Sequence, residues 1–563
     1  MRRAADSIGS LLRVPTAGLV GATLFFCMSM TPSLLPRDWM FQGLIGGISA
    51  AIGHGVGVVV AAACRRWVAP RLSFWPPTDV VRTRIHLGLR VFCVVASVLM
   101  LIPAVAWQRR LADIMGTTPP TLIGYSRTLL LSAVIALGII AIARGLRDES
   151  RWVAGLLMRR WRVPRRIALV AGAVVVAVVT YLFVAGVGVR GGYAALNWAF
   201  SVQNDTTRDG AVQPTEPEKS GSPMSKASWD SLGFEGRNFV SGGVGAAELS
   251  RLTGRPAKEP IRVYAGLESA GDTASRMRVV VDELERTGAF DRKTLVVIPT
   301  TGTGWVNPTA AQTIELVSGG DSALVAAQYS YLPSWLSFVA DRPAAAAAGR
   351  ALLDAVHERW ATKPANHRPK LYIYGESLGT QAGEGAFDSL ADIRSTVDGV
   401  LWVGPPNSNP LWRSLTERRD PGTPEAEPTY ADGLVVRFAN DTAGIERNHG
   451  QWLSPRILYI QHRSDPVVWW STDLLFTRPD WLAEPPAGDR HPSMRWFPIV
   501  TFWQVSADLG NAAGVPDGHG HNYGTQVLDG WVAVTHPAGW TDADTERIRH
   551  ALVELRGHDG PEK

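Results

Sequence analysis

Five long apolar runs in the first 190 residues constrain the fold more than any other feature of the sequence. They lie near residues 14–33, 41–63, 87–107, 121–143 and 167–189. Each is long enough to cross a hydrocarbon core of about 30 Å as a helix. No acidic residue lies inside the runs and arginines cluster between them, which disfavours a set of buried helices in a soluble core. The sequence therefore predicts an all-α transmembrane region over residues 1–200.

The arginines also predict an orientation. The N-terminus and the four connections between the runs carry 3, 1, 5, 2 and 8 arginines in turn. Cytoplasmic segments are the ones enriched in Arg and Lys, so the N-terminus and the even connections are expected in the cytoplasm. Five crossings would then deliver the rest of the chain to the outside. We expect a multi-pass plasma-membrane protein with an extracytoplasmic C-terminal domain.

The basic pI of about 9.1 is a property of the membrane region. Residues 1–200 contain 22 Arg and no Lys against 6 acidic residues, whereas the remainder has 34 basic and 45 acidic residues. The charge therefore indicates membrane lipids as partners and argues against nucleic acid. The three cysteines all lie within the first hundred residues, which excludes a disulfide scaffold or a Cys-ligated metal in the remainder. No metal cluster, nucleotide loop or cofactor motif is recognised, so no cofactor is expected.

The remainder divides into a linker over 201–235 and a domain over 236–563. The linker is rich in Pro, Ser and charge and has no apolar period, which predicts an exposed, flexible tether. In the domain, strand-like runs alternate with helical patterns such as 344–360. The predicted strands are 260–267, 294–300, 321–332, 370–375, 398–406 and 456–465. This alternation predicts an α/β domain with a mostly parallel sheet and helices on both faces.

The sequence "YGESLGTQAGEG" places Ser377 between Gly375 and Gly379, after a predicted strand and before a run able to begin a helix. A G-x-S-x-G sequence in that context predicts a sharp turn that exposes a nucleophilic serine above the sheet. The alternative is an ordinary small residue in an ordinary turn. The strand before the motif and the helical pattern after it favour the nucleophile.

A nucleophilic serine needs a base, and the base needs an acid that orients it. The expected order along the chain is Ser, then acid, then His. Asp465 follows the apolar run 456–465, and Asp441, after "LVVRFAN", is the second candidate. The base is expected in the late glycine-rich loop "DGHGHNYG", where His521 is preferred and His519 is the alternative.

The oxyanion formed on the substrate also needs donors. The backbone N–H of Leu378, directly after the serine, is the first candidate. The loop "PTTGTGWVNP" after the strand 294–300 is the expected source of the second donor, with Thr303 or Gly302 as the residue. Glycines let backbone N–H groups of this loop approach a developing alkoxide without steric conflict.

These segments, with "NFVSGG", "WVGPPNSNP" and "IQHRSDPVVWW", resemble an actinobacterial family of membrane-anchored α/β-hydrolases. Members join an N-terminal multi-helix membrane region to a C-terminal hydrolase domain. The similarity extends over most of residues 238–531 and agrees with the layout of the membrane region. It implies an α/β-hydrolase fold and serine chemistry, and says little about the substrate.

A membrane-anchored serine hydrolase acting on a lipid or cell-envelope lipid ester, through a Ser-His-Asp triad and an acyl-enzyme, is the expected function. Tryptophans crowd between the acid and the histidines, and they are expected either as a rim facing the bilayer or as ordinary packing. A lipid transacylase using the same acyl-enzyme is one alternative. A lipid-transport or scaffold protein with an inactive outer domain is the other.

Overall fold

The computed structural model describes residues 14–71, 78–332, 342–447 and 450–559. Contacts divide the chain into two units. Unit 1 comprises residues 1–194 together with 472–511, and unit 2 comprises residues 195–471 together with 512–563. The division is therefore not a simple cut, because one late segment of the chain joins the N-terminal helices.

Unit 1 is helical, as the apolar runs predict. Its N-terminal helices are α2 (Thr16–Ser29), α3 (Trp39–Ala63), α4 (Asp79–Leu99), α5 (Leu101–Met115), α6 (Leu122–Trp161) and α7 (Arg165–Phe183). Among the residues that the structure describes, four helical segments are long and apolar enough to cross a membrane: Trp39–Val68, Asp79–Met115, Leu122–Trp161 and Arg165–Gly186.

The first predicted span is shorter than expected. Helix α2 has 14 residues, which gives a length of about 21 Å against a hydrocarbon core of about 30 Å. It begins after Pro15, and the helix stops at Ser29, ahead of the Thr31–Pro32 pair that extended backbone favours. The five predicted spans are thus four long apolar helices and one short one. The extracytoplasmic placement of the C-terminal domain requires an odd number of crossings, and it stays a prediction.

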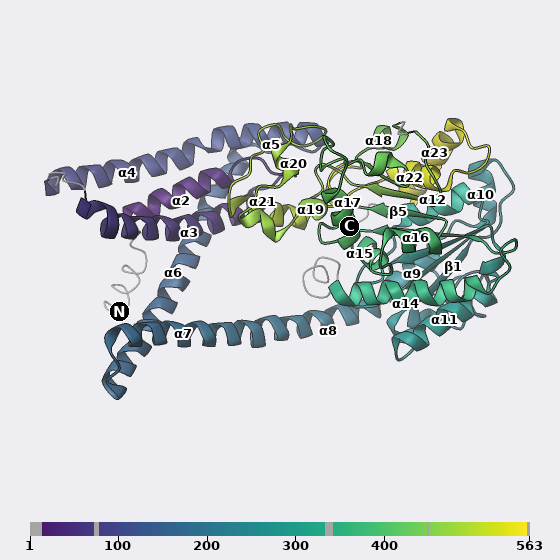
Figure 1. The fold of residues 1–563 in the computed structure, drawn as a ribbon, viewed down its shortest axis with the longest axis horizontal. Coiled ribbons are helices and arrows are strands. Elements are labelled where there is room, and N and C mark those ends of the chain that lie inside the picture. The colour runs from purple at the N-terminus through teal and green to yellow at the C-terminus, as the bar shows by residue number, and fades with distance from the viewer. Residues whose placement is uncertain (1–13, 72–77, 333–341, 448–449, 560–563) are drawn as a thin grey trace. The chain divides into compact units, whose positions relative to one another are not determined.

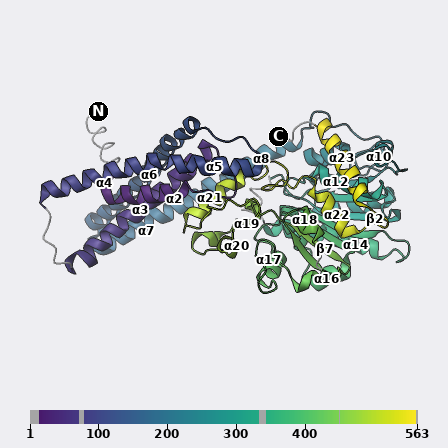
Figure 2. The same ribbon diagram turned by 90° about the horizontal axis from the view of Figure 1, so that it is seen from above.

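Residues 472–511 pack against the N-terminal helices through buried polar groups. They carry α20 (Asp480–Ala483) and α21 (Val500–Asp508), and Figures 1 and 2 both show α21 beside the ends of α2 and α3. The fully buried Asp508 carboxylate accepts hydrogen bonds from the Ser33 hydroxyl and, at 3.0 Å, from Leu34 N. The guanidinium of Arg37, which is also buried, lies 3.4 Å from its other oxygen. A polar cluster therefore fixes this segment in unit 1.

We expect Asp508→Ala to release this segment. The change would leave Arg37 buried without its carboxylate, which costs about 3–5 kcal/mol of unfolding free energy. Asp38→Asn is the control, because it also removes one negative charge next to Arg37. Asp38 caps α3 through Met40 N and Phe41 N, and Asn caps a helix equally well, so this variant should keep the segment in place. Limited proteolysis of the full chain in detergent should cut residues 472–511 faster in Asp508→Ala alone. Equal protection of both variants would contradict the role of the cluster.

Residues 469–503 are rich in Trp, but two of these tryptophans are not at a surface. Trp469, which precedes residues 472–511 and belongs to unit 2, and Trp481, within them, are 1% and 3% exposed. The indole of Trp469 donates to His462 O at 2.9 Å. These two side chains serve packing, which was one of the two expectations for them.

Unit 2 is built on one seven-stranded parallel sheet with the order β1-β3-β2-β4-β5-β7-β6. The strands are β1 (Ile261–Ala265), β2 (Thr294–Pro299), β3 (Ser322–Ala327), β4 (Lys370–Glu376), β5 (Gly399–Val403), β6 (Val436–Ala439) and β7 (Arg456–Ile460). All six predicted strands are present. The additional strand β6 lies at the sheet edge, and β7 lies between it and β5. Both faces of the sheet are covered, which explains why the strands are near-continuous apolar runs.

Helices cover the two faces of this sheet, so the predicted α/β class is confirmed. One face carries α11 (Thr273–Arg286), α14 (Arg342–Ala361) and α15 (Leu378–Glu384), and the other carries α12 (Pro308–Ser318), α22 (Gln526–Thr535) and α23 (Asp542–Asp559) (Figure 1). The remaining α-helices of unit 2 are α8 (Gly192–Asn204), which starts in unit 1, α9 (Gly233–Ser241), α10 (Ala246–Thr253), α16 (Leu390–Thr396), α17 (Pro410–Glu417), α18 (Thr442–Glu446) and α19 (Pro466–Trp469). Tyr374, Leu401 and Trp531 are among the fully buried side chains of the core between sheet and helices.

The segment predicted as a flexible tether over 201–235 is instead bonded to unit 2. Lys219 pairs with Arg262 of β1 in a parallel bridge, and Ser220 N donates to Arg262 O at 2.9 Å. Arg237 holds the start of the segment through Asn204 O at 2.6 Å. β1 is an edge strand whose backbone groups need partners, and this segment supplies them. Composition indicated only a polar segment without an apolar period and could not reveal this edge pairing.

Candidate active site

Ser377 lies at the carboxyl end of β4, at the first turn of α15. Its backbone has φ 56° and ψ −127°, a strained conformation for a residue with a side chain. Ser377 N donates to Val403 O of β5 at 2.9 Å, so the turn is tied to the neighbouring strand. The side chain is partly exposed while its neighbours Glu376 and Leu378 are buried. The local geometry is the sharp strand-to-helix turn that the sequence predicts around this serine.

Gly379 allows the helix to begin this close to the sheet. A Cβ atom at residue 379 would collide with the carbonyl oxygen of Pro299, the last residue of β2. Larger side chains at this position would push α15 and the serine away from the loop after β2. The second glycine of the motif is therefore required by packing.

Asp465 and His521 are brought together by two different parts of unit 2. Asp465 is fully buried after β7, at the N-cap of α19. His521 lies in the loop before α22, and its Nδ1 is 2.7 Å from Asp465 Oδ2. The Asp465 carboxylate also accepts Val467 N at 2.8 Å and the Tyr523 hydroxyl at 2.6 Å. These three bonds fix the position of the carboxylate, and the carboxylate in turn orients the imidazole.

The Nδ1–Cε1 edge of the His521 ring faces the end of β5. A Cβ atom at Gly404 would lie 2.5 Å from His521 Cε1, so the ring lies against this glycine, whose φ is +58°. Gly404 directly follows Val403, which bonds to Ser377. His521 Nε2 is buried and has no hydrogen-bond partner among the residues that the structure describes. No hydrogen bond joins it to the Ser377 hydroxyl, although such bonds are often long before substrate binds.

The two alternative residues lie elsewhere. Asp441 is exposed after the edge strand β6 and caps α18 through Gly444 N at 2.7 Å. The backbone of His519 pairs with Asn522 within the loop, and it is His521 whose imidazole bonds to Asp465. The geometry therefore favours the preferred acid and base over the alternatives.

The proposed oxyanion donors lie around the same turn. The N–H groups of Leu378, Gly302 and Thr303 donate to no acceptor within the described part of the chain. The loop that carries Gly302 and Thr303 is fixed by Ser330 N, which donates to Gly302 O at 3.0 Å. Asn307 links the loop to the turn, because its side chain donates to Glu376 at 2.8 Å. Backbone N–H groups without an acceptor are the kind of donor that stabilises an oxyanion.

Comparison with known proteins assigns the family. A family model described as the alpha/beta-hydrolase family matches residues 261–548, just over half of the chain. The chain belongs to the alpha/beta-hydrolase family. A second model, for the N-terminus of the same family, matches residues 30–243 and so includes most of the apolar helices. No curated protein and no solved structure matches the chain.

The hydrolase domain contains supporting residues that the motif did not reveal. Both ring nitrogens of His462 lie within hydrogen-bond distance of this loop and the helix after it: Nδ1 is 2.8 Å from Gly520 O, and Nε2 is 2.6 Å from the side-chain amide of Gln526. Its ring stacks on Tyr523 with centroids 4.1 Å apart. Together they fix the loop that carries His521. The pairing of "IQHRSD" with "GHGHNYG" is a contact between distant segments, so no local sequence pattern predicts it.

The hydrolase should have an activity that rises with pH. Burial disfavours protonation of His521, but the charge of Asp465, the hydrogen bond to it and the charge of Glu376 together raise the pKa of His521 above 6.5. A general base works only when neutral, so kcat/KM should increase through a midpoint above about 6.5. Glu376→Gln removes one negative charge and should lower that midpoint. Profiles measured with 4-nitrophenyl butyrate would test this, with Asp441→Asn as a distant charge control. A wild-type midpoint below 6.5 would contradict the prediction.

Proposed function

We propose that this hydrolase is a membrane-bound serine esterase that acts on a lipid ester. The observation that carries the proposal is the buried Asp465–His521 pair beside the strained turn at Ser377. A family assignment alone supports a hydrolase-like domain. The specific chemistry comes from these three side chains, which stand in the order nucleophile, acid, base along the chain.

The proposed reaction has two steps. Ser377 Oγ attacks the ester carbonyl carbon while His521 Nε2 accepts the hydroxyl proton. The N–H of Leu378 and one N–H of the loop around Gly302 and Thr303 receive the negative charge on the carbonyl oxygen. The alcohol leaves with the proton from His521. Water then attacks the acyl-serine by the same route and restores the enzyme.

A lipid substrate is favoured by where the chain is anchored. Unit 1 contains four helices that are long and apolar enough to cross a bilayer, so the esterase would work close to a membrane. A lipid ester could then reach the site without passing through water. If an alcohol replaced water in the second step, the same acyl-enzyme would act as a transacylase.

The test uses the purified full chain reconstituted into phospholipid vesicles that contain diacylglycerol. Released fatty acid and newly acylated lipid are measured by mass spectrometry for wild type and for Ser377→Ala. The proposal expects release or transfer that depends on Ser377. Free fatty acid as the main product supports the esterase, and new lipid esters support the transacylase. Equal product from both proteins would overturn the proposal and favour an inactive, scaffold-type domain.

A further inference from the structure

A cavity of about 380 Å³ adjoins the turn that carries Ser377. It lies at the carboxyl ends of β2 and β3, where Pro299, Thr300 and Gln328 line it. Ala382, five residues after Ser377 on α15, forms another part of the wall. Pro299 and Thr300 also lie against Gly379, where a Cβ atom would be 2.4 Å from Pro299 O, so the cavity shares wall residues with the turn of Ser377.

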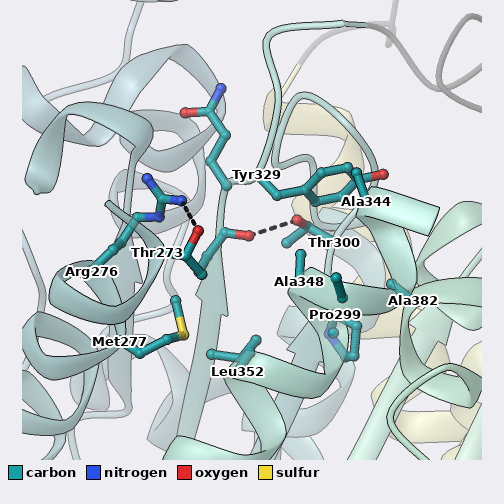
Figure 3. A pocket seen from close by; sticks show the side chains of 14 residues that line it. Thr273, Arg276, Met277, Pro299, Thr300, Tyr329, Ala344, Ala348, Leu352 and Ala382 are labelled. Carbon is teal, nitrogen blue, oxygen red and sulfur yellow. Dashed lines mark hydrogen bonds between the residues drawn. The ribbon is translucent and has the colours of Figure 1, made fainter. Parts of the chain in front are cut away.

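Most of the wall is apolar and small. Ala344, Ala348 and Leu352 recur at spacings of four on α14 and present one face of this helix to the cavity (Figure 3). Met277 of α11 and Pro299 complete the apolar lining. The space exists because alanines stand where larger side chains would fill it. Its volume is at the lower end of the range for ligand sites, so it suits a compact group and not a long acyl chain.

One cation stands in this apolar wall. Arg276 of α11 is 7% exposed and lies across the cavity from Ala382 in Figure 3. Its Nη1 and Nη2 donate to Leu267 O and to the Thr273 hydroxyl, both at 3.3 Å. Its Nε has no partner among the described residues, and no carboxylate in the described part of the chain lies within ion-pair distance of it.

The lack of an ion pair distinguishes Arg276 from Arg262, a buried arginine with a structural role. Arg262, which is 1% exposed, forms two bonds with Glu315, at 2.6 Å and 2.9 Å. A guanidinium taken out of water without a carboxylate or short hydrogen bonds is costly. Burial lowers the pKa of Arg276, and the charge of Asp272, one helical turn earlier, only partly offsets this effect. A carboxylate or phosphate matches the fork of N–H groups on arginine and would offset that cost.

We propose that this cavity binds a compact anionic group of the ester substrate, a carboxylate or a phosphate, with Arg276 as its partner. The inference rests on the proposed esterase function and specifies its substrate class. The ester would carry its anion a short spacer away from the scissile bond, and any long acyl chain would lie outside this cavity.

The test compares two chromogenic esters with the purified full chain. One is 4-nitrophenyl butyrate and the other is mono-4-nitrophenyl glutarate, which ends in a carboxylate. The ratio of kcat/KM for the glutarate to that for the butyrate is the readout. A charge-assisted pair supports a preference of at least about tenfold for the glutarate in wild type. Arg276→Met should reduce this ratio by tenfold or more, and Arg276→Lys should reduce it less.

Two further variants separate the role of Arg276 from effects on folding. Arg278 is on the same helix but exposed, and Arg278→Gln should leave the ratio unchanged. Ala348→Leu fills the cavity while keeping Arg276, and it should also reduce the ratio. Inhibition of wild type by inorganic phosphate and by glutarate then identifies which anion is preferred, by the lower inhibition constant.

The outcomes distinguish this inference from the function on which it rests. Turnover of both esters without preference for the glutarate, with Ser377 reactive toward a fluorophosphonate, would overturn the anion site alone. A preference that survives in both Arg276→Met and Ala348→Leu would do the same. Turnover of neither ester, with Ser377 unreactive, would overturn the proposed esterase and the anion site together.

Discussion

Replacing His521 by alanine should lower kcat for ester hydrolysis by about 10⁴-fold or more, as loss of a triad base does in serine hydrolases. His521 Nδ1 is 2.7 Å from the buried Asp465, and its ring lies against Gly404, next to the residue whose carbonyl accepts Ser377 N. Its Nε2 is buried and has no hydrogen-bond partner among the described residues. Without the imidazole, the Ser377 hydroxyl loses the base proposed to accept its proton. Steady-state hydrolysis of 4-nitrophenyl butyrate by the full chain measures the loss.

His519→Ala is the matched control for that experiment. It changes the same residue type two positions away, in the same glycine-rich loop. We expect less than a tenfold change in kcat, and unfolding followed by tryptophan fluorescence should be similar for both variants. A larger loss in His519→Ala than in His521→Ala would contradict the assignment of the base.

Asp465→Asn should reduce kcat by about 10⁴-fold while leaving the fold intact. The amide nitrogen of Asn would donate to His521 Nδ1, where the carboxylate accepts from it. The ring proton would then sit on Nε2, and Nε2 could no longer accept the proton of the serine hydroxyl. Asn also keeps the cap of α19, in which Asp465 accepts Val467 N. The loss should therefore appear in kcat and not in stability.

Two further variants, Tyr523→Phe and Asp441→Asn, provide comparisons for the loss of kcat in Asp465→Asn. Tyr523→Phe removes one of the bonds to Asp465 Oδ2 and should cost roughly ten- to a hundredfold in kcat, since a hydrogen bond to a charged group is worth about 1.5–3 kcal/mol. Asp441→Asn, at the exposed cap of α18, should cost little. An Asp441→Asn enzyme more impaired than Asp465→Asn would identify the other carboxylate as the acid.

The local parts of this candidate site are readable from the sequence. The apolar run of β4, the glycines at 375 and 379 and the helical pattern after them lie within fifteen residues of each other. Strand-end placement also predicted Asp465, because parallel strands bring their carboxyl ends to one edge. The choice between His519 and His521 as the base, in contrast, does not follow from local sequence. Both lie in the same loop, and only the loop conformation held by His462 and Tyr523 turns one ring toward the acid.

Non-local pairing explains the features that the sequence did not reveal. The position of β7 between β5 and β6 depends on sheet order, which no single strand encodes. The segment around Ser220 lacks any apolar period, yet it covers the edge of β1 through backbone bonds. Residues 472–511 are held in unit 1 by a buried polar cluster at Asp508. Hydropathy does not reveal such a cluster, because it records the polarity of a residue and not its partner in the fold.

The most direct test of the central claim is covalent labelling by a fluorophosphonate, with the modified peptide identified by mass spectrometry. The full chain in membranes should acquire an adduct on Ser377, and Ser377→Ala should acquire none. Ser408→Ala, which alters a hydroxyl bonded to Gln381 of α15, should label like wild type. Equal labelling of wild type and Ser377→Ala, or a folded wild type that does not label, would contradict the assignment of Ser377 as the nucleophile.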